Sequence, residues 1–208
     1  MFAPGAGRFL GPVAVALVVV VLLGISGAFP ASVALVGFAA GLAALLGFLA
    51  AFFRDPDRAP GAAIVSAADG RVRSVERIGD RLRISVFMNV TNVHVNRFPL
   101  ASTVAAVSSG GRGFRPAYAP EAEANVQRRY RLDTELGPIE VVQITGIVAR
   151  RLVSFVRPGD RAAKGDRLGM IVLGSRVDVH LPADRVEPLV APGQAVRAGV
   201  TSIARERT

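Results

Sequence analysis

The sequence predicts an N-terminal two-helix transmembrane hairpin followed by a mainly β domain. Three observations lead to this fold class. Residues 9–53 contain no charged side chain, whereas all 16 acidic and 24 of the 25 basic residues lie from Arg54 onward. After that boundary the pattern changes to short runs of alternating apolar residues separated by Gly, Pro and Asp, which is typical of strands and turns. We therefore expect a membrane hairpin over 1–53 and a β-rich domain over 54–208.

The apolar region divides at a proline into two runs, 9–29 and 31–53. Each run has about the 20 residues that a helix needs to cross a bilayer. The short connection requires a hairpin with both ends on one side of the membrane. Arg8 precedes the first run and Arg54 follows the second, while the turn carries no charge, so the positive-inside rule places both ends in the cytoplasm. A cleaved signal peptide followed by a stop-transfer segment is the alternative.

Beyond the hairpin we expect a small β-barrel or sandwich. No helical periodicity is evident after residue 60, and the stretch Ser108–Arg131, rich in Gly, Pro, Ala and Arg, is predicted to be a long loop. The predicted strands are Ala63–Val65, Gly70–Val75, Arg81–Met88, Ile139–Ile144, Arg151–Val156, Met170–Leu173, Arg176–Leu181 and Ala195–Val196.

An internal repeat supports this architecture. Residues 158–165 (PGDRAAKG) and 192–199 (PGQAVRAG) share the pattern of a Pro-Gly turn, a short strand and a second glycine. The pair suggests two related hairpins, as in biotinyl/lipoyl-like folds, although such turns also recur by chance in β proteins.

Composition narrows the chemistry. The chain has no cysteine and two histidines, which leaves no thiolate chemistry and makes a multi-histidine metal site improbable; we expect no metal. The 54–208 region has a formal charge of +8 (24 minus 16), which favours an anionic partner. A membrane surface is favoured over nucleic acid, because the hairpin already places the domain at lipid and no nucleic-acid-binding motif is present. We therefore expect no nucleic-acid partner.

Three stretches could carry chemistry, and each alone has an ordinary structural explanation: an Asp-Gly turn, a histidine in a half-buried strand, and a Gly-Ser bulge. Together they supply Asp69, His94 and Ser175, the set that activates a hydroxyl, because serine needs a base and the base needs an orienting carboxylate. The residues alone do not say that these three meet in space. The stretches are Ser66–Gly70, Phe87–Arg97 and Leu168–His180.

In their order along the chain and in their residues, these stretches resemble the motifs of phosphatidylserine decarboxylase proenzymes of the short bacterial and archaeal type. The family's SPADG, its VHxxR histidine motif and its Gly-Ser self-cleavage segment are similar to SAADG, NVHVNR and IVLGSRVDVHLP here. RDPDR and GIVARRL look like further family segments. The sequence departs from the family at Asn125–Gln127, where relatives usually have Asn-Glu-Arg.

The resemblance implies a pyruvoyl-dependent lyase made from a zymogen. In this interpretation Ser175, activated by His94 with Asp69 behind it, attacks the carbonyl of Gly174. The resulting ester eliminates and hydrolyses to leave a β chain, 1–174, and an α chain, 175–208, that begins with a covalent pyruvoyl group derived from Ser175. That group forms an imine with phosphatidylserine and accepts the electrons of the departing carboxylate, His94 supplies a proton, and phosphatidylethanolamine and CO2 are released. The expected location is the cell (inner) membrane, with the catalytic domain on its cytoplasmic side.

Two other functions remain open from the residues. A biotinyl/lipoyl-like carrier domain at the membrane would share the predicted hairpins and would need an exposed lysine, for which Lys164 is the chain's only candidate. A Ser-His-Asp hydrolase would keep Ser175 intact, although the G-x-S-x-G elbow is absent. His180 shares a strand face with Asp178 in a regular strand, and we predict a structural role for it.

Overall fold

The computed structural model describes residues 1–208 except 27–32, 114, 118, 148–150, 173–174 and 208. The chain divides into two compact units, Met1–Pro56 and Asp57–Thr208. Each unit is described by itself below.

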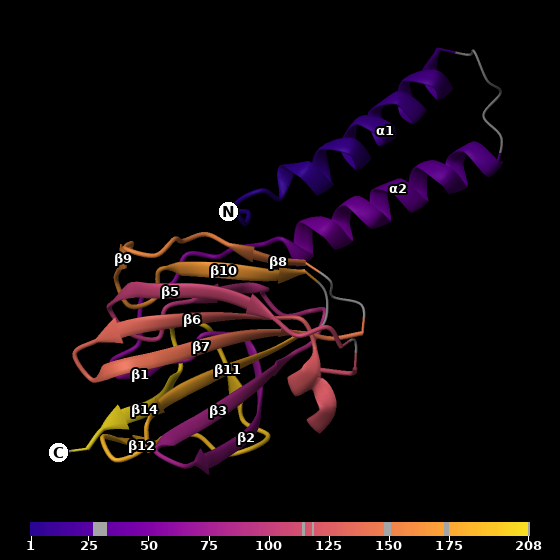
Figure 1. The fold of residues 1–208 in the computed structure, drawn as a ribbon. Coiled ribbons are helices and arrows are strands. Elements are labelled where there is room, and N and C mark those ends of the chain that lie inside the picture. The colour runs from indigo at the N-terminus through magenta and orange to yellow at the C-terminus, as the bar shows by residue number, and fades with distance from the viewer. Residues whose placement is uncertain (27–32, 114, 118, 148–150, 173–174, 208) are drawn as a thin grey trace. The chain divides into compact units, whose positions relative to one another are not determined.

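The first unit holds two apolar helices, α1 (Gly7–Ile25) and α2 (Val33–Phe52), as the sequence predicts (Figure 1). Both are long and apolar enough to cross a membrane. Within them only Phe52 is buried, and the other described residues are exposed or half-buried, so a large apolar surface is left open. Exposing so large an apolar surface to water is unfavourable, which suggests that the unit associates with a membrane. The predicted connection, 27–32, lies outside the described residues.

The second unit is mainly β, and its described strands form antiparallel sheets (Figure 1). The largest has the order β13-β2-β3-β11-β7-β6-β5-β9, and two smaller ones have the orders β1-β14-β12 and β4-β10-β8. The bounds are β1 Ile64–Val65, β2 Gly70–Ile78, β3 Arg81–Met88, β4 Val95–Arg97, β5 Ser102–Gly110, β6 Gln127–Thr134, β7 Gly137–Thr145, β8 Arg151–Ser154, β9 Arg161–Ala162, β10 Arg167–Val172, β11 Ser175–Pro182, β12 Val186–Pro188, β13 Ala195–Val196 and β14 Ser202–Glu206.

Alternation along the strands builds the core. In β11, Val177, Val179 and Leu181 belong to the main apolar cluster, while the residues between them face the other side of the sheet. In β6 the buried Tyr130 and Leu132 alternate with exposed arginines. Every predicted strand overlaps an observed one, although Leu173, at the end of one prediction, lies outside the described residues.

The predicted loop over Ser108–Arg131 is wrong at both ends. β5 continues to Gly110, and β6 begins at Gln127. The strand pattern was hidden because arginines occupy the outward positions of β6 and small residues fill the end of β5. Between the two strands lies a short 3-10 helix, η1 (Pro120–Ala124).

The internal repeat corresponds to a structural repeat. β9 follows the first Pro-Gly turn and pairs with β5, while β13 follows the second and pairs with β2, at the two ends of the large sheet. Gly159 and Gly193 have φ of 93° and 90°, and their N–H groups donate to the carbonyls of Val104 and Val72, respectively. The two turns therefore close onto opposite sheet edges in the same way. Their likeness to biotinyl/lipoyl hairpins stays a prediction.

Candidate active site

One end of the large sheet collects residues from distant parts of the chain. There β2 begins at Gly70, β3 ends at Met88, β11 begins at Ser175 and β7 ends at Thr145. Ser175 lies opposite Met88 on one side and opposite Thr145 on the other. Because neighbouring strands are antiparallel, the start of one strand meets the end of the next. Asp69, which directly precedes β2, therefore comes to the same end of the sheet as Ser175.

Ser175 is fully buried at the first position of β11. Its Oγ contacts the Sδ atom of Met88 at 3.3 Å. A thioether sulfur is a weak hydrogen-bond acceptor, so this contact does little to hold the hydroxyl. Gly174, the other half of the predicted cleavage site, lies outside the described residues.

His94 is also fully buried, immediately before β4. Its backbone carbonyl accepts a hydrogen bond from the N–H of Ile171, on the strand that leads toward Ser175. Its Nδ1 lies 2.9 Å from the carbonyl oxygen of Asn92. A carbonyl can only accept, so Nδ1 carries a proton, and in the neutral form of the ring the basic lone pair is then on Nε2. This tautomer is the one in which Nε2 can act as a base.

Asp69 is held by two partners. Arg58 donates from Nη1 to Oδ1 at 2.5 Å and from Nη2 to Oδ2 at 2.9 Å, and the N–H of Ala198 donates to Oδ1 at 2.8 Å. The segment before Asp69 is tied to the histidine stretch, because the N–H of Arg97 donates to the carbonyl of Ala67. Among the described residues, Asp69 is thus bonded to Arg58 and Ala198, and its role in orienting His94 stays a prediction.

Four polar side chains missed by the sequence reasoning surround this end of the sheet. Asn96, Gln143 and Tyr130 are buried and form a chain of hydrogen bonds that reaches Met88. Asn125 is buried too, and its amide bonds the backbone of Arg115 and, at 2.6 Å, the carbonyl of Thr145. Asn96 lies inside the histidine motif, but no sequence signal marks Gln143 or Tyr130, because these side chains are brought to Asn96 only by strand register. Asn125 could have been found, since it begins the stretch that departs from the family pattern.

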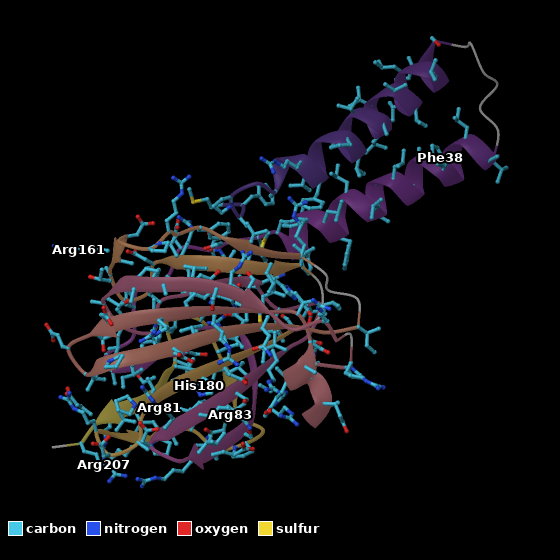
Figure 2. All side chains as sticks on the ribbon, viewed as in Figure 1. Phe38, Arg81, Arg83, Arg161, His180 and Arg207 are labelled. Atoms are coloured by element: carbon cyan, nitrogen blue, oxygen red, sulfur yellow. The ribbon has the colours of Figure 1, made fainter. Side chains whose placement is uncertain are left out.

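The other face of β11 carries a buried ion pair. The guanidinium of Arg176 donates from Nε and Nη2 to the carboxylate of Asp178, at 2.9 and 2.7 Å, and both side chains are almost fully buried. Arg176 and Asp178 line a cavity of about 80 Å³, and His180 and Arg83 line it too. His180 lies opposite Arg83 of the neighbouring strand, and Figure 2 labels both side chains. Burial lowers the pKa of His180 below its usual value, although the carboxylate of Asp178 acts in the opposite direction. His180 therefore lies across the sheet from the Ser175 hydroxyl, in agreement with a structural role.

Comparison with known proteins decides the family. The phosphatidylserine decarboxylase profile matches residues 45–204. The chain belongs to the phosphatidylserine decarboxylase family. It is 47% identical over 165 residues to a phosphatidylserine decarboxylase proenzyme of Thermobifida fusca, covering 78% of this chain and 76% of the relative. It is also 48% identical over 166 residues to a putative archaetidylserine decarboxylase proenzyme of Halobacterium salinarum, covering 78% of this chain and 83% of the relative.

Membership of the phosphatidylserine decarboxylase family makes the chain an enzyme and confirms the resemblance seen in its motifs. It also weakens the carrier alternative, and the geometry of Lys164 agrees. The Nζ of Lys164 donates to the carbonyls of Ala62 and Ala63, at 2.8 and 3.3 Å. A carrier lysine must project freely from a hairpin tip, whereas this one is bound to the backbone of a neighbouring segment.

Proposed function

We propose that this member of the phosphatidylserine decarboxylase family cuts its own chain between Gly174 and Ser175, converts Ser175 into a pyruvoyl group, and uses that group to decarboxylate phosphatidylserine. The observation that carries the proposal is the position of Ser175: a buried serine at the start of a strand, in a family whose relatives are named proenzymes. The expected products of processing are a β chain, 1–174, and an α chain, 175–208.

The surroundings of Ser175 fit this conversion. Its hydroxyl touches a thioether rather than a strong acceptor, so little hydrogen bonding must be broken before it reacts. The Ser175 side chain is fully buried, so water is kept from its hydroxyl. Once formed, a pyruvoyl group supplies the electron sink that decarboxylation requires.

His94 is the proton carrier in this proposal. Its Nδ1–H is committed to the carbonyl of Asn92, so Nε2 is the atom that accepts the Ser175 proton and later returns a proton to the substrate carbon. Asp69 acts at the same end of the sheet. Its carboxylate is held in place by hydrogen bonds from Arg58 and from the N–H of Ala198, and in this proposal it orients His94.

The N-terminal hairpin serves the substrate in this account. The headgroup of phosphatidylserine lies at the membrane surface, so a domain tethered there meets it directly. The +8 formal charge of residues 54–208 favours an anionic leaflet by about 1 kcal/mol for each basic side chain near the surface. We propose that the domain lies on the cytoplasmic side of the cell membrane, where positive-inside orientation would place both ends of the hairpin.

The test is decarboxylation by purified full-length protein of phosphatidylserine in mixed vesicles, followed as phosphatidylethanolamine formed. Ser175→Ala is expected to abolish the activity and to leave one uncleaved chain. Ser108→Ala, which removes an exposed hydroxyl from β5, is the matched control and is expected to behave as wild type. Wild-type activity in Ser175→Ala would refute the proposal.

A further inference from the structure

A line of buried polar side chains crosses the core and ends beside Ser175. The hydroxyl of Tyr130 donates to Oε1 of Gln143 at 3.1 Å, and Nε2 of Gln143 donates to Oδ1 of Asn96 at 2.7 Å. Nδ2 of Asn96 then approaches Sδ of Met88 at 3.7 Å, the same sulfur that the Ser175 hydroxyl contacts. All five side chains are buried, so these bonds are shielded from water.

The line has a direction. Because Tyr130 donates to the amide oxygen of Gln143, the amide nitrogen of Gln143 must point at Asn96. That nitrogen can only donate, so it bonds the oxygen of Asn96, and the Asn96 NH2 group is turned toward Met88, whose sulfur also contacts the Ser175 hydroxyl. Tyr130 thus sets the orientation of the Asn96 NH2 group through Gln143, which lies between them.

This arrangement costs stability that an apolar core would not lose. Burying two amides and a phenol is unfavourable unless every polar group is bonded. Only glycine fits at position 169 beside the Tyr130 hydroxyl. A Cβ at Gly169 would lie 2.8 Å from Oη of Tyr130 and 2.6 Å from the carbonyl oxygen of Val153. Burial raises the pKa of Tyr130, so its hydroxyl remains a donor.

The line ends in a poor bond. A thioether is a weak acceptor and 3.7 Å is long, so the Asn96 N–H gains little from Met88. A donor that is rigidly aimed but weakly bonded is ready to bind a stronger acceptor, and an oxygen gaining negative charge is such an acceptor.

We propose that Asn96 donates the hydrogen bond that stabilises the oxyanion formed when the Ser175 hydroxyl attacks the preceding carbonyl, and that Gln143 and Tyr130 are its positioning residues. The inference rests on the proposed self-cleavage. In that step the Oγ–C bond forms, the C–N peptide bond breaks, and the hydroxyl proton passes to the nitrogen that becomes the free amine. The negative charge is transient and lies on the carbonyl oxygen of Gly174.

The test is the rate of self-cleavage of freshly synthesised full-length chain, followed by gel and intact mass. Asn96→Leu keeps the approximate shape and removes the donor, so we expect cleavage to slow about 100- to 1,000-fold. Asn89→Leu makes the same change at an exposed position one residue after Met88, and it is expected to cleave at the wild-type rate.

Neutral hydroxylamine identifies the step that is blocked, because it cleaves esters much faster than peptide bonds. Without the oxyanion donor the ester forms more slowly, so the Asn96→Leu precursor is expected to resist a brief treatment with hydroxylamine. Precursor that hydroxylamine splits into 1–174 and 175–208 would show that the ester forms normally, and it would overturn the proposal.

A double variant separates positioning from general damage to the core. Gln143→Met is expected to slow cleavage less than Asn96→Leu does. Combined with Asn96→Leu it is expected to add nothing further, because Gln143 acts through Asn96. Additive losses would refute the positioning role. Tyr130→Phe removes a single oxygen and gives a second, gentler measurement in case the larger changes prevent folding; cleavage at the wild-type rate in that variant would also count against the proposal.

The proposal and the function on which it rests fail in different ways. If wild-type chain is never cut, self-cleavage itself is refuted. If wild-type chain is cut, Ser175→Ala is not, and Asn96→Leu is cut at the wild-type rate, only the role of Asn96 is refuted.

Discussion

Removing the carboxylate of Asp178 is expected to destabilise the β domain strongly. The side chain of Arg176 is fully buried, and its guanidinium donates hydrogen bonds to the carboxylate of Asp178. Deleting one partner of a buried pair costs about 3–5 kcal/mol, because the other charge is left without compensation. Glu123 lies 3.8 Å from the guanidinium and would compensate in part, which places Asp178→Ala near the lower limit, about 3 kcal/mol.

In a domain of this size 1 kcal/mol shifts the melting temperature by about 2–4 °C, so Asp178→Ala is expected to melt about 6–12 °C below wild type. The assay is thermal unfolding of full-length protein in detergent, followed by circular dichroism of the strands. Glu187→Ala is the control, because it breaks an exposed pair with Arg205 and should cost about 1 kcal/mol or less. Arg176→Met/Asp178→Leu should recover most of the loss, since it removes both charges. Asp178→Ala melting within the range of Glu187→Ala would refute the reasoning.

Two further predictions concern His180 and Gly70. The pKa of His180 is lowered by burial, so the unfolded chain binds a proton more readily than the folded one, and stability is lost as the pH falls below about 6.5. The drop in melting temperature from about pH 7.5 to about pH 5 should therefore be smaller in His180→Gln than in wild type. An equal drop in the two proteins would show that His180 does not contribute to the loss of stability. Gly70→Ala should cost more than the about 1–3 kcal/mol of a strained φ, because φ is +151° and a Cβ would lie 2.0 Å from the carbonyl oxygen of Phe87. Gly79→Ala, with φ of +61° and open space, should cost less in the same urea titration, and equal losses would show that the close approach to Phe87 does not matter.

The parts of the fold that follow from local pattern were predictable. The uncharged run from Phe9 to Phe53 predicted two apolar helices, and the strand Arg81–Met88 was found with its observed bounds. Strands whose outward positions are arginine or small residues were missed. β6 is the clearest case, because Tyr130 and Leu132 alternate with charges that resemble a loop.

The site was predictable only as a set of chemical groups. Asp69, His94 and Ser175 could be chosen because their side chains complete a known chemistry, but their partners depend on long-range register. Arg58 comes to Asp69 from before the first strand, and Asn96 reaches Gln143 across 47 positions of sequence. No periodicity in one segment encodes such a pairing.

The mass of the purified full-length protein tests the central claim most directly. The account predicts two chains, 1–174 and 175–208, with the second lighter by one ammonia than a simple hydrolysis product, because Ser175 has become a pyruvoyl group. Ser175→Ala should give one chain of 208 residues. A single uncut chain that still decarboxylates phosphatidylserine would contradict the account.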